Sequence, residues 1–174
     1  SGSLFIVLRK PTTKTSQSLP EEKPQTLDIT PLLGSWQVSF AKANGGPGQP
    51  VELPQLADWS QNEDPQIRHY SGTANYRQTF PWQAESPGRV WLDLGQVANI
   101  AHVFLNDIDC GYAWTPPYRV DVTKALREGT NSLTIAVTNT WANRLIGDSK
   151  LPLKQRLTWT TAPPVPSDAK LLPA

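Results

Sequence analysis

Acidic side chains are the first residues in this chain to consider for catalysis. Hydrolysis of a glycosidic bond needs two carboxyl groups roughly 5 to 10 Å apart, one of them with a raised pKa. The acids here fall on loops and outward strand positions, and no two share one side of a strand at a two-residue spacing. They include Asp58, Glu63, Asp64, Asp93, Asp121 and Asp148. We therefore predict that this chain contains no catalytic residues.

Other catalytic chemistries also lack their residues. His69 and His102 are the only histidines, and neither has a cysteine nearby in the sequence. This spacing argues against a zinc site or a histidine-activated nucleophile. His102 shares the parity of Ile100 and Phe104, so we expect a hydrogen-bonded sheet residue. No Gly-x-Ser-x-Gly elbow occurs, and Cys110, the single cysteine, cannot form an internal disulfide.

Aromatic residues give the strongest binding signal, since the chain has seven tryptophans and four tyrosines. Sugar rings stack their C–H faces on aromatic rings, while Arg, Asn and Asp bind hydroxyl groups. Residues 141–144, Trp-Ala-Asn-Arg, combine a ring with polar groups at the end of a predicted strand. The residues predicted to bind carbohydrate are Trp59, Tyr112, Trp114, Trp141, Asn143, Arg144 and Asp148.

A structural interpretation of the same aromatics stays open. In that interpretation Trp36, Trp82 and Trp91 fill the core, and another set docks on a neighbouring domain. The docking set is Trp141, Arg144 and Trp159.

Charge and hydropathy exclude two classes of partner. Sixteen basic and fifteen acidic residues leave a net charge of +1, and no basic run could follow a phosphate backbone, so we predict no nucleic-acid partner. The apolar run Leu4–Leu8 is far shorter than the ~20 residues of a membrane-spanning helix, so we predict no membrane partner.

Alternating apolar and polar residues predict an all-β fold, an antiparallel β-sandwich. The expected strands are 36–40, 75–80, 89–94, 100–105 and 132–138. Period-two spacing directs one set of aliphatic side chains inward. The expected core set is Val90, Leu92, Leu94, Leu133, Ile135 and Val137.

Turn signals lie between these strands. We expect hairpins at residues 86–88, 106–107 and 128–131, because Gly, Asn and Asp tolerate unusual backbone angles. One short helical turn is expected over residues 122–127, capped by Asp121 or Thr123.

Composition divides the chain into three parts. Residues 1–10 contain a short apolar strand, left from a preceding domain or from cloning. Residues 11–26 are rich in Pro, Thr and Ser and predict a linker, and residues 27–174 carry the sandwich.

Several segments together resemble a known family. These are YSGTANYRQTF, LDLGQVANIAHVFLND, WTPPYRVDVTKALREGTNSLTIAVTN and WANRLIGD. They are similar to the galactose-binding-like jelly roll of glycoside hydrolases, as in the sugar-binding domain of family 2. The ending, with TWTT and LLPA, is most similar to the C-terminal domain of family 106 α-L-rhamnosidases.

The resemblance implies a non-catalytic carbohydrate-binding or accessory domain of a rhamnosidase-like glycoside hydrolase. The implied partners are a rhamnose-containing or plant cell-wall glycan and the catalytic domain of the parent enzyme, in a secreted or periplasmic location. Two alternatives stay open: a purely structural interdomain module without a sugar site, and a small jelly-roll hydrolase or lyase.

The resemblance also raises the question of calcium, since jelly rolls of this kind often hold one ion in a loop. The available carboxylate donors are Asp28, Asp58, Asp64 and Asp148. No Asp-x-Asp-x-Asp loop is present, so we predict no required cofactor and at most a structural calcium ion.

Two positions depart from the family pattern. Asp107 stands where Gly is usual in the hairpin, and Cys110 where an aliphatic residue is usual. Because Asp tolerates a positive φ less well than Gly, we expect a wider hairpin here.

Overall fold

The computed structural model describes residues 29–84, 88–160, 165–166 and 168–174. The chain divides into two units, Ser1–Leu33 and Gly34–Ala174, and every helix and strand described below belongs to the second. The strand expected in residues 1–10, the linker at 11–26 and the turn at residues 86–87 lie outside the described residues.

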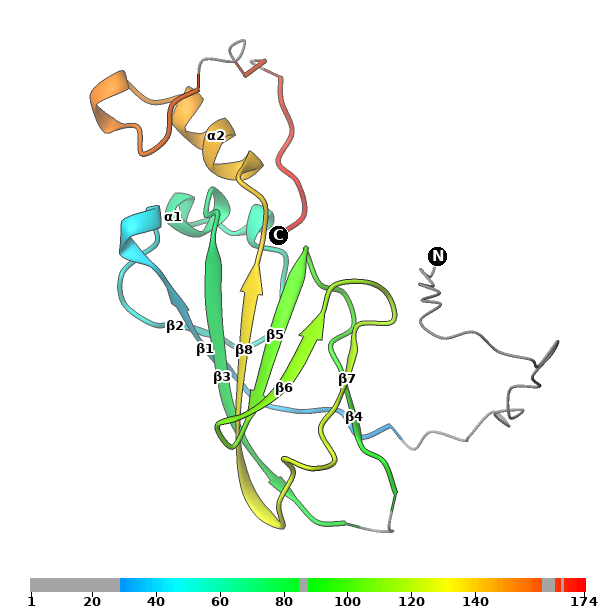
Figure 1. The fold of residues 1–174 in the computed structure, drawn as a ribbon. Coiled ribbons are helices and arrows are strands. Elements are labelled where there is room, and N and C mark those ends of the chain that lie inside the picture. Colours follow the sequence, from blue (N-terminus) through cyan, green and yellow to red (C-terminus); the bar gives the residue numbers. More distant parts are fainter. Residues whose placement is uncertain (1–28, 85–87, 161–164, 167) are drawn as a thin grey trace, which may run out of the picture. The chain divides into compact units, whose positions relative to one another are not determined.

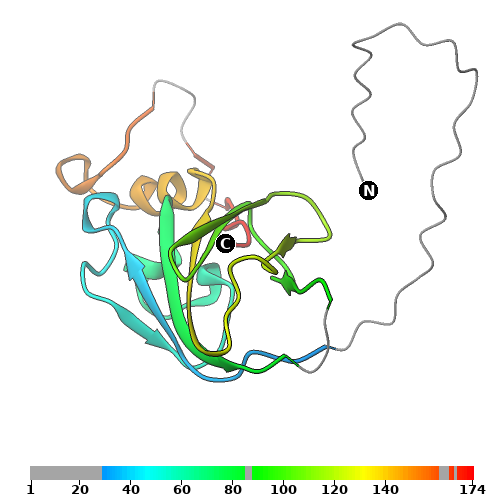
Figure 2. The same cartoon turned by 60° about the horizontal axis from the view of Figure 1, so that its bottom comes forward.

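The second unit is built on a six-stranded antiparallel sheet with the order β2-β1-β3-β8-β5-β6 (Figure 1). In that order the strands are Val51–Leu53, Trp36–Phe40, Thr73–Trp82, Gly129–Thr138, Ile100–Leu105 and Ile108–Ala113. A second sheet pairs β4 (Trp91–Asp93) with β7 (Arg119–Asp121), and β7 contacts β6 (Figure 2). The predicted antiparallel β-sandwich is confirmed.

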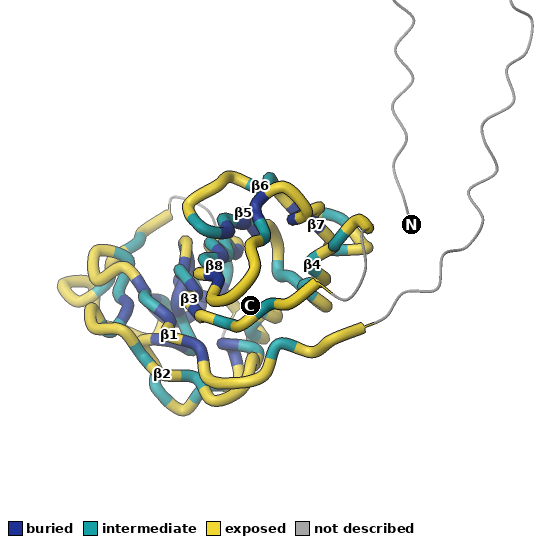
Figure 3. The backbone as a smooth tube through the Cα atoms, turned by 90° about the horizontal axis from the view of Figure 1, so that it is seen from below, coloured by how far each residue is buried: buried dark blue, intermediate teal, exposed yellow. Residues whose placement is uncertain are grey.

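One face of the large sheet forms the core, as period-two spacing requires. Val38, Ala74 and Val103 are completely buried, and Leu105 and Leu133 almost so. Val120 and Val122 are buried on the side of the smaller sheet. Figure 3 shows the buried residues gathered along β1, β3, β8 and β5. Each buried aliphatic side chain contributes about 1.5–3 kcal/mol by removal from water.

The predicted core is confirmed only in part. Leu133 and Ile135 are buried, and Val137 is half-buried. Val90, Leu92 and Leu94 are also only half-buried, and Trp91 is exposed. The reason is that β4 belongs to a two-stranded sheet, which covers less surface than the large sheet.

Aromatic rings close one end of the core. The ring of Phe40 meets Trp59 and Tyr70 edge-to-face, with centroids 5.3 and 5.0 Å away, and Trp59 stacks on Tyr76. The indole N–H of Trp59 donates to the Tyr76 hydroxyl. Burial raises the pKa of Tyr76 to about 12, so this hydroxyl stays protonated.

Short helices connect or follow the strands, and those labelled η are 3₁₀ helices. They are η1 (Lys42–Asn44), η2 (Trp59–Gln61), α1 (Pro65–Arg68), α2 (Ala142–Ser149) and η3 (Leu153–Gln155). Asp58 and Asp64 cap η2 and α1 by accepting from Ser60 N and Gln66 N, both at 2.8 Å. No helix in the described ranges is long and apolar enough to cross a membrane.

The helical turn expected over residues 122–127 is confirmed only as a single turn, and it does not extend into a helix. That segment forms a turn in which Val122 O accepts from Ala125 N and Leu126 N, both at 3.0 Å. Asp121 does accept from Thr123 N as an expected cap. The turn stops there because the next residues connect the small sheet to β8.

The β5–β6 hairpin is tight, and the wider hairpin expected from Asp107 is therefore wrong. Leu105 pairs with Ile108, and Asn106 and Asp107 have φ values of 52° and 64°. Asn and Asp tolerate this region better than most residues. The Asn106 side chain also donates to Ala125 O at 2.8 Å and to Asn131 Oδ1 at 2.7 Å, which fixes the turn against the neighbouring loop.

The hairpin expected at residues 128–131 does not form either. Gly129 and Asn131 belong to β8 itself, which pairs with β3 and not with β7. The segment therefore crosses from one sheet to the other.

Replacing Leu133 with Ala removes a side chain that is only 1% exposed. We expect the free energy of unfolding to fall by about 2–5 kcal/mol, because a cavity is left in the core. The control is Thr134→Ala, the next residue on the opposite face, with a change below about 1 kcal/mol. Urea unfolding measures both, and equal midpoints would contradict this assignment of the core face.

Acid should weaken the small sheet through Asp93. Its Oδ2 accepts from Arg119 Nε at 2.7 Å, and both side chains are well exposed. The Gly95 N–H first, and then Arg119, lower the pKa of Asp93. A carboxyl with a lowered folded-state pKa stabilises at neutral pH, and this contribution disappears as the pH falls below about 4.

Exposure limits that contribution to less than about 1 kcal/mol. Thermal unfolding at a series of pH values should show a shallower acid slope for Asp93→Asn than for the unaltered chain. The exposed Glu63→Gln variant should keep the original slope. An unchanged slope in Asp93→Asn would count against the role of this ion pair.

Candidate functional site

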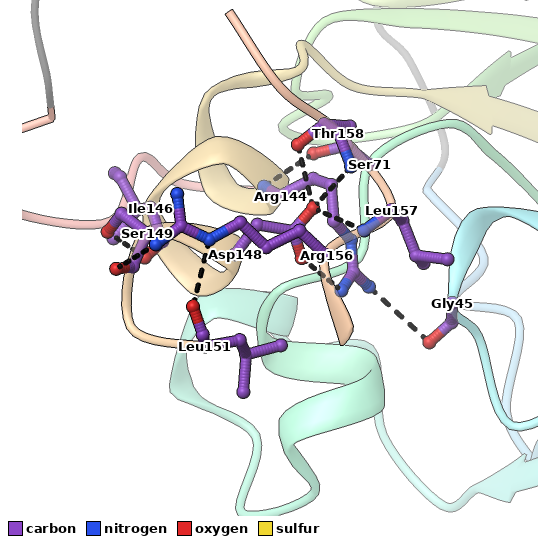
Figure 4. Close-up of polar contacts among 10 residues, drawn as sticks. All are labelled: Gly45, Ser71, Arg144, Ile146, Asp148, Ser149, Leu151, Arg156, Leu157 and Thr158. Carbon is purple, nitrogen blue, oxygen red and sulfur yellow. Dashed lines mark hydrogen bonds and ion pairs between the residues drawn. The ribbon is translucent and has the colours of Figure 1, made fainter. Parts of the chain in front are cut away.

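The predicted polar site residues belong to helix α2, which begins directly after β8. Trp141 is the N-cap and its side chain is 57% exposed, whereas Asn143, Arg144 and Asp148 are buried. Figure 4 shows the polar contacts of Arg144 and Asp148. We call these two residues, together with Gly45, Ser71, Leu157 and Thr158, the Arg144–Asp148 cluster. The sequence pattern had placed residues 141–144 at a strand end, and the helix was missed.

Asp148 is the main acceptor of the Arg144–Asp148 cluster. Its Oδ2 accepts from Leu157 N at 3.0 Å, and from Thr158 N and Thr158 Oγ1, each at 2.7 Å. Its Oδ1 lies 3.5 Å from Arg144 Nη1. The residue is 2% exposed, so the carboxylate ties the segment after η3 to helix α2 and offers little to an external ligand.

Arg144 joins α2 to two distant parts of the chain. Its Nη2 donates to Gly45 O at 3.4 Å, and its backbone N–H donates to Ser71 Oγ at 3.0 Å. Gly45 has φ of 78°, and a Cβ there would lie 2.5 Å from Arg144 Nη2. The guanidinium therefore reaches Gly45 only because that residue has no side chain.

Asn143 and Asp58 hold the segment that ends at Ala174. The Asn143 amide exchanges two hydrogen bonds with the Leu172 backbone, both at 2.7 Å. Asp58 Oδ1 accepts from Ala174 N at 2.9 Å, and Trp59 N donates to Ala174 O at 2.8 Å. The Asn143 side chain thus bonds the backbone of Leu172 as a paired strand would, and this satisfies its buried amide group.

His69 lies against α2, where a Cβ on Gly147 would come within 2.7 Å of its side chain. Burial first, and then Arg68, Lys150 and Arg144, lower its pKa. It is therefore neutral at pH 7 and adds no second positive charge beside Arg144.

Trp59, Asn143, Arg144 and Asp148 are therefore enclosed in the protein. Trp59 is 2% exposed and contacts three other rings. A direct role of these four residues in carbohydrate binding stays a prediction, and it would require the Arg144–Asp148 cluster or the aromatic core to open.

Tyr112, Trp114 and Trp141 are the predicted site residues that reach the surface. Tyr112 lies on β6, and Trp114 follows that strand and is 60% exposed. Trp141 lies at the start of α2, on the other side of β8 in the sequence. The structure therefore divides the predicted site among β6, the loop after it and α2.

Tyr112 belongs to a group of side chains on β5 and β6, which we call the Tyr112 platform: His102, Phe104, Asp109 and Tyr112. The Tyr112 and His102 rings stack with centroids 3.8 Å apart and planes at 21°. His102 also contacts Phe104, at 4.2 Å, and bonds Asp109 Oδ1 at 2.9 Å. The expectation that His102 is a hydrogen-bonded sheet residue is confirmed.

His102, Phe104 and Asp109 were not among the residues predicted from the sequence to bind carbohydrate. The shared parity of His102 and Phe104 was visible, but Asp109 and Tyr112 are three residues apart and should point to opposite faces of a regular strand. A bulge at Cys110 cancels that alternation, and the sequence alone does not show it.

Metal binding has little support in the part of the chain that the structure describes. No group of three His, Cys, Asp or Glu side chains comes together there. Asp58, Asp64 and Asp148 already accept backbone hydrogen bonds, and Asp28 lies outside the described residues. A calcium ion held mainly by backbone carbonyls stays a prediction.

The Arg144–Asp148 cluster yields a stability prediction. Asp148→Leu keeps roughly the size of the side chain but removes both acceptor oxygens. We expect the free energy of unfolding to fall by about 1–3 kcal/mol, because backbone donors lose their partner. Amide hydrogen exchange at Leu157 and Thr158 should accelerate.

The matched control is Asp168→Leu, which replaces an exposed carboxyl on the same C-terminal stretch. It should leave both the stability and the exchange rates unchanged. Unaltered exchange at Leu157 and Thr158 in Asp148→Leu would contradict the bonding described for this carboxylate.

Comparison with known proteins places this geometry in a family. The model of the glycosyl hydrolase 2 galactose-binding domain-like family matches residues 56–166. A protein named "Putative beta-glucuronidase" from Formosa agariphila is 43% identical over 125 residues, which is 70% of this chain and 11% of that protein.

Solved structures agree. A rhamnosidase from Novosphingobium sp. PP1Y superposes with a TM-score of 0.80 and 38% identity, over 95% of this chain and 16% of that chain. A β-glucuronidase from Ruminococcus gnavus gives a TM-score of 0.52 at 21% identity, over 62% of this chain and 21% of that chain, which shows the fold alone. The chain spans only a small part of each relative, and it belongs to the glycosyl hydrolase 2 galactose-binding-like domain family.

Proposed function

We propose that this chain is a non-catalytic, carbohydrate-binding accessory domain of a larger, rhamnosidase-like glycoside hydrolase. The observation that carries the proposal is the superposition on the Novosphingobium rhamnosidase, which uses 95% of this chain but only 16% of that one. The rest of the rhamnosidase chain is long enough to contain a separate catalytic domain.

The carboxyl groups support a non-catalytic role. A general acid for glycoside cleavage needs a raised pKa. The pKa values of Asp93, Asp109 and Asp121 are instead lowered, in each case mainly by a hydrogen bond to the charged form. Asp148 is occupied by Leu157, Thr158 and Arg144.

One hollow available to the hydrolase alternative has a volume of about 370 Å³ and is lined by Ala57, Asp58, Gln61, Asn62 and Glu63. Asp58 and Glu63 are its two carboxyl groups. Asp58 Oδ1 already accepts from two backbone N–H groups, so it stabilises η2 and the segment that ends at Ala174. This arrangement supports a structural role for the hollow.

The proposed partners follow from the same relationship. They are a rhamnose-containing or plant cell-wall glycan and the catalytic domain of the parent enzyme, and the proposed location is secreted or periplasmic.

A second candidate function is a purely structural interdomain module. It is favoured by exposed apolar side chains after β8, among them Trp141, Leu153 and Trp159. Apolar surface of this kind is typical of a face that contacts another domain.

Isothermal titration of the purified chain with rhamnose, galactose and pectic oligosaccharides distinguishes the candidates. We expect at least one saccharide to bind with a Kd between about 1 mM and 1 μM, because shallow sites bind weakly. A reducing-sugar assay on the same mixtures should stay at background.

Absence of binding to every saccharide would favour the interdomain module. Release of reducing sugar by the chain would overturn the non-catalytic assignment, and Asp58→Asn and Glu63→Gln variants would then show whether the hollow is responsible.

A further inference from the structure

We propose that the domain binds saccharides on the outer face of its six-stranded sheet, with the Tyr112 platform as the contact surface. This inference rests on the proposed carbohydrate-binding function. It locates the site on β5 and β6, and not at the polar residues of α2.

A backbone irregularity builds the platform. Val103 pairs with Gly111 and Phe104 pairs with Asp109, so Cys110 is an extra residue on β6. Gly111 has φ of 95°, which favours glycine. The bulge puts Asp109 and Tyr112 beside Phe104 and His102 on the same side of the sheet, although a regular strand would separate them.

His102 fixes the tyrosine ring in position. Its imidazole covers one face of Tyr112 and is itself held by Asp109 and by contact with Phe104. The Tyr112 side chain remains 61% exposed. An aromatic ring backed on one face and open to solvent loses little conformational freedom when a ligand stacks on it.

Asp109 supplies a hydrogen-bond acceptor next to the ring. Its bonds from His102 Nε2 at 2.9 Å and Gly111 N at 2.8 Å both end on Oδ1. The side chain is 58% exposed, so Oδ2 is the oxygen that a ligand hydroxyl can reach. These same bonds, that of His102 first, lower the pKa of Asp109 and keep it ionised, hence an acceptor.

The surrounding face suits a saccharide better than a protein partner. Tyr112, His102, Ala136 and Asn75 are consecutive cross-strand neighbours from β6 to β3. Strands lie about 4.8 Å apart, so this row is roughly 14 Å long, which matches a short oligosaccharide. Ala136 leaves a low floor, and Asn75 supplies an amide at the far end.

The next row runs from Phe104 of the platform to the polar residues Thr134 and Arg77. Ile100, at the start of β5, adds an exposed aliphatic side chain. An obligate protein interface would show a larger apolar area. The ligand class we infer is a pyranose chain that presents an apolar C–H face to Tyr112 and hydroxyl groups to Asp109.

Isothermal titration of four variants of the whole chain, with the saccharide that binds the unaltered chain best, tests the site. Tyr112→Ala should weaken binding at least tenfold, and Tyr112→Phe, which keeps the ring, should stay within about twofold. Asp109→Asn should weaken binding about three- to tenfold, because a charged acceptor is replaced by a neutral one. Trp141→Ala tests the competing site predicted at the N-cap of α2, and its affinity should be unchanged if the Tyr112 platform is the contact surface.

Circular dichroism and thermal unfolding establish that each variant is folded. A folded Tyr112→Ala protein with unaltered affinity, or a loss of binding in Trp141→Ala alone, would overturn the platform while saccharide binding by the domain remained. If the unaltered chain bound no saccharide, the proposed function itself would fail, so the two failures are distinguishable.

Discussion

The pairing of β3 with β8 is the interaction on which the rest of this domain depends. The two strands pair along ten residues each, from Thr73 opposite Thr138 to Trp82 opposite Gly129, although they are about fifty residues apart in the sequence. Their common inner face carries Tyr76, Gln78, Leu133 and Ile135 into the core. Their outer face and their ends position everything that we consider functional.

Two different features follow from that pairing. At one end, Ser71 just before β3 meets Arg144 just after β8, so the start of α2 is tied to the central strands. On the outer face, β8 also pairs with β5, which carries His102 and in turn holds β6. The Arg144–Asp148 cluster is therefore a product of the strand ends, and the Tyr112 platform a product of the sheet surface. Their chemistry differs accordingly, since the first is buried and internally bonded whereas the second is open.

The fold could be predicted from the sequence because apolar and polar residues alternate along each strand, and the apolar ones point into the core. The strands at residues 36–40 and 100–105 match, and Leu133 and Ile135 are buried as expected. Helix α2 was not predicted, because residues 142–149 include polar residues that a local pattern assigns to the surface. Three of them are buried because they hydrogen-bond to Gly45, Leu157 and Leu172. Those partners lie far away or in irregular segments, so a local pattern cannot reveal them.

The candidate site was only partly predictable for a similar reason. Tyr112 was identified as an aromatic near a loop, but Asp109 was not, because its position beside Tyr112 depends on the bulge at Cys110. The departures from the family pattern at Asp107 and Cys110 fall in this same hairpin. Asn and Asp support the tight turn, and the extra residue reorients the strand. The sequence shows that these two positions depart from the family pattern, but it does not show the backbone geometry that results.

The central claim is that this domain recognises saccharides on a sheet face and does not cleave them. Amide chemical-shift mapping by NMR, with a ¹⁵N-labelled chain and a bound oligosaccharide, tests it most directly. We expect the largest shifts at His102, Asp109, Gly111 and Tyr112, with little change at Asn143, Arg144 and Asp148. Shifts concentrated on helix α2 or around Asp58 and Glu63, with the β5–β6 hairpin unaffected, would contradict the account.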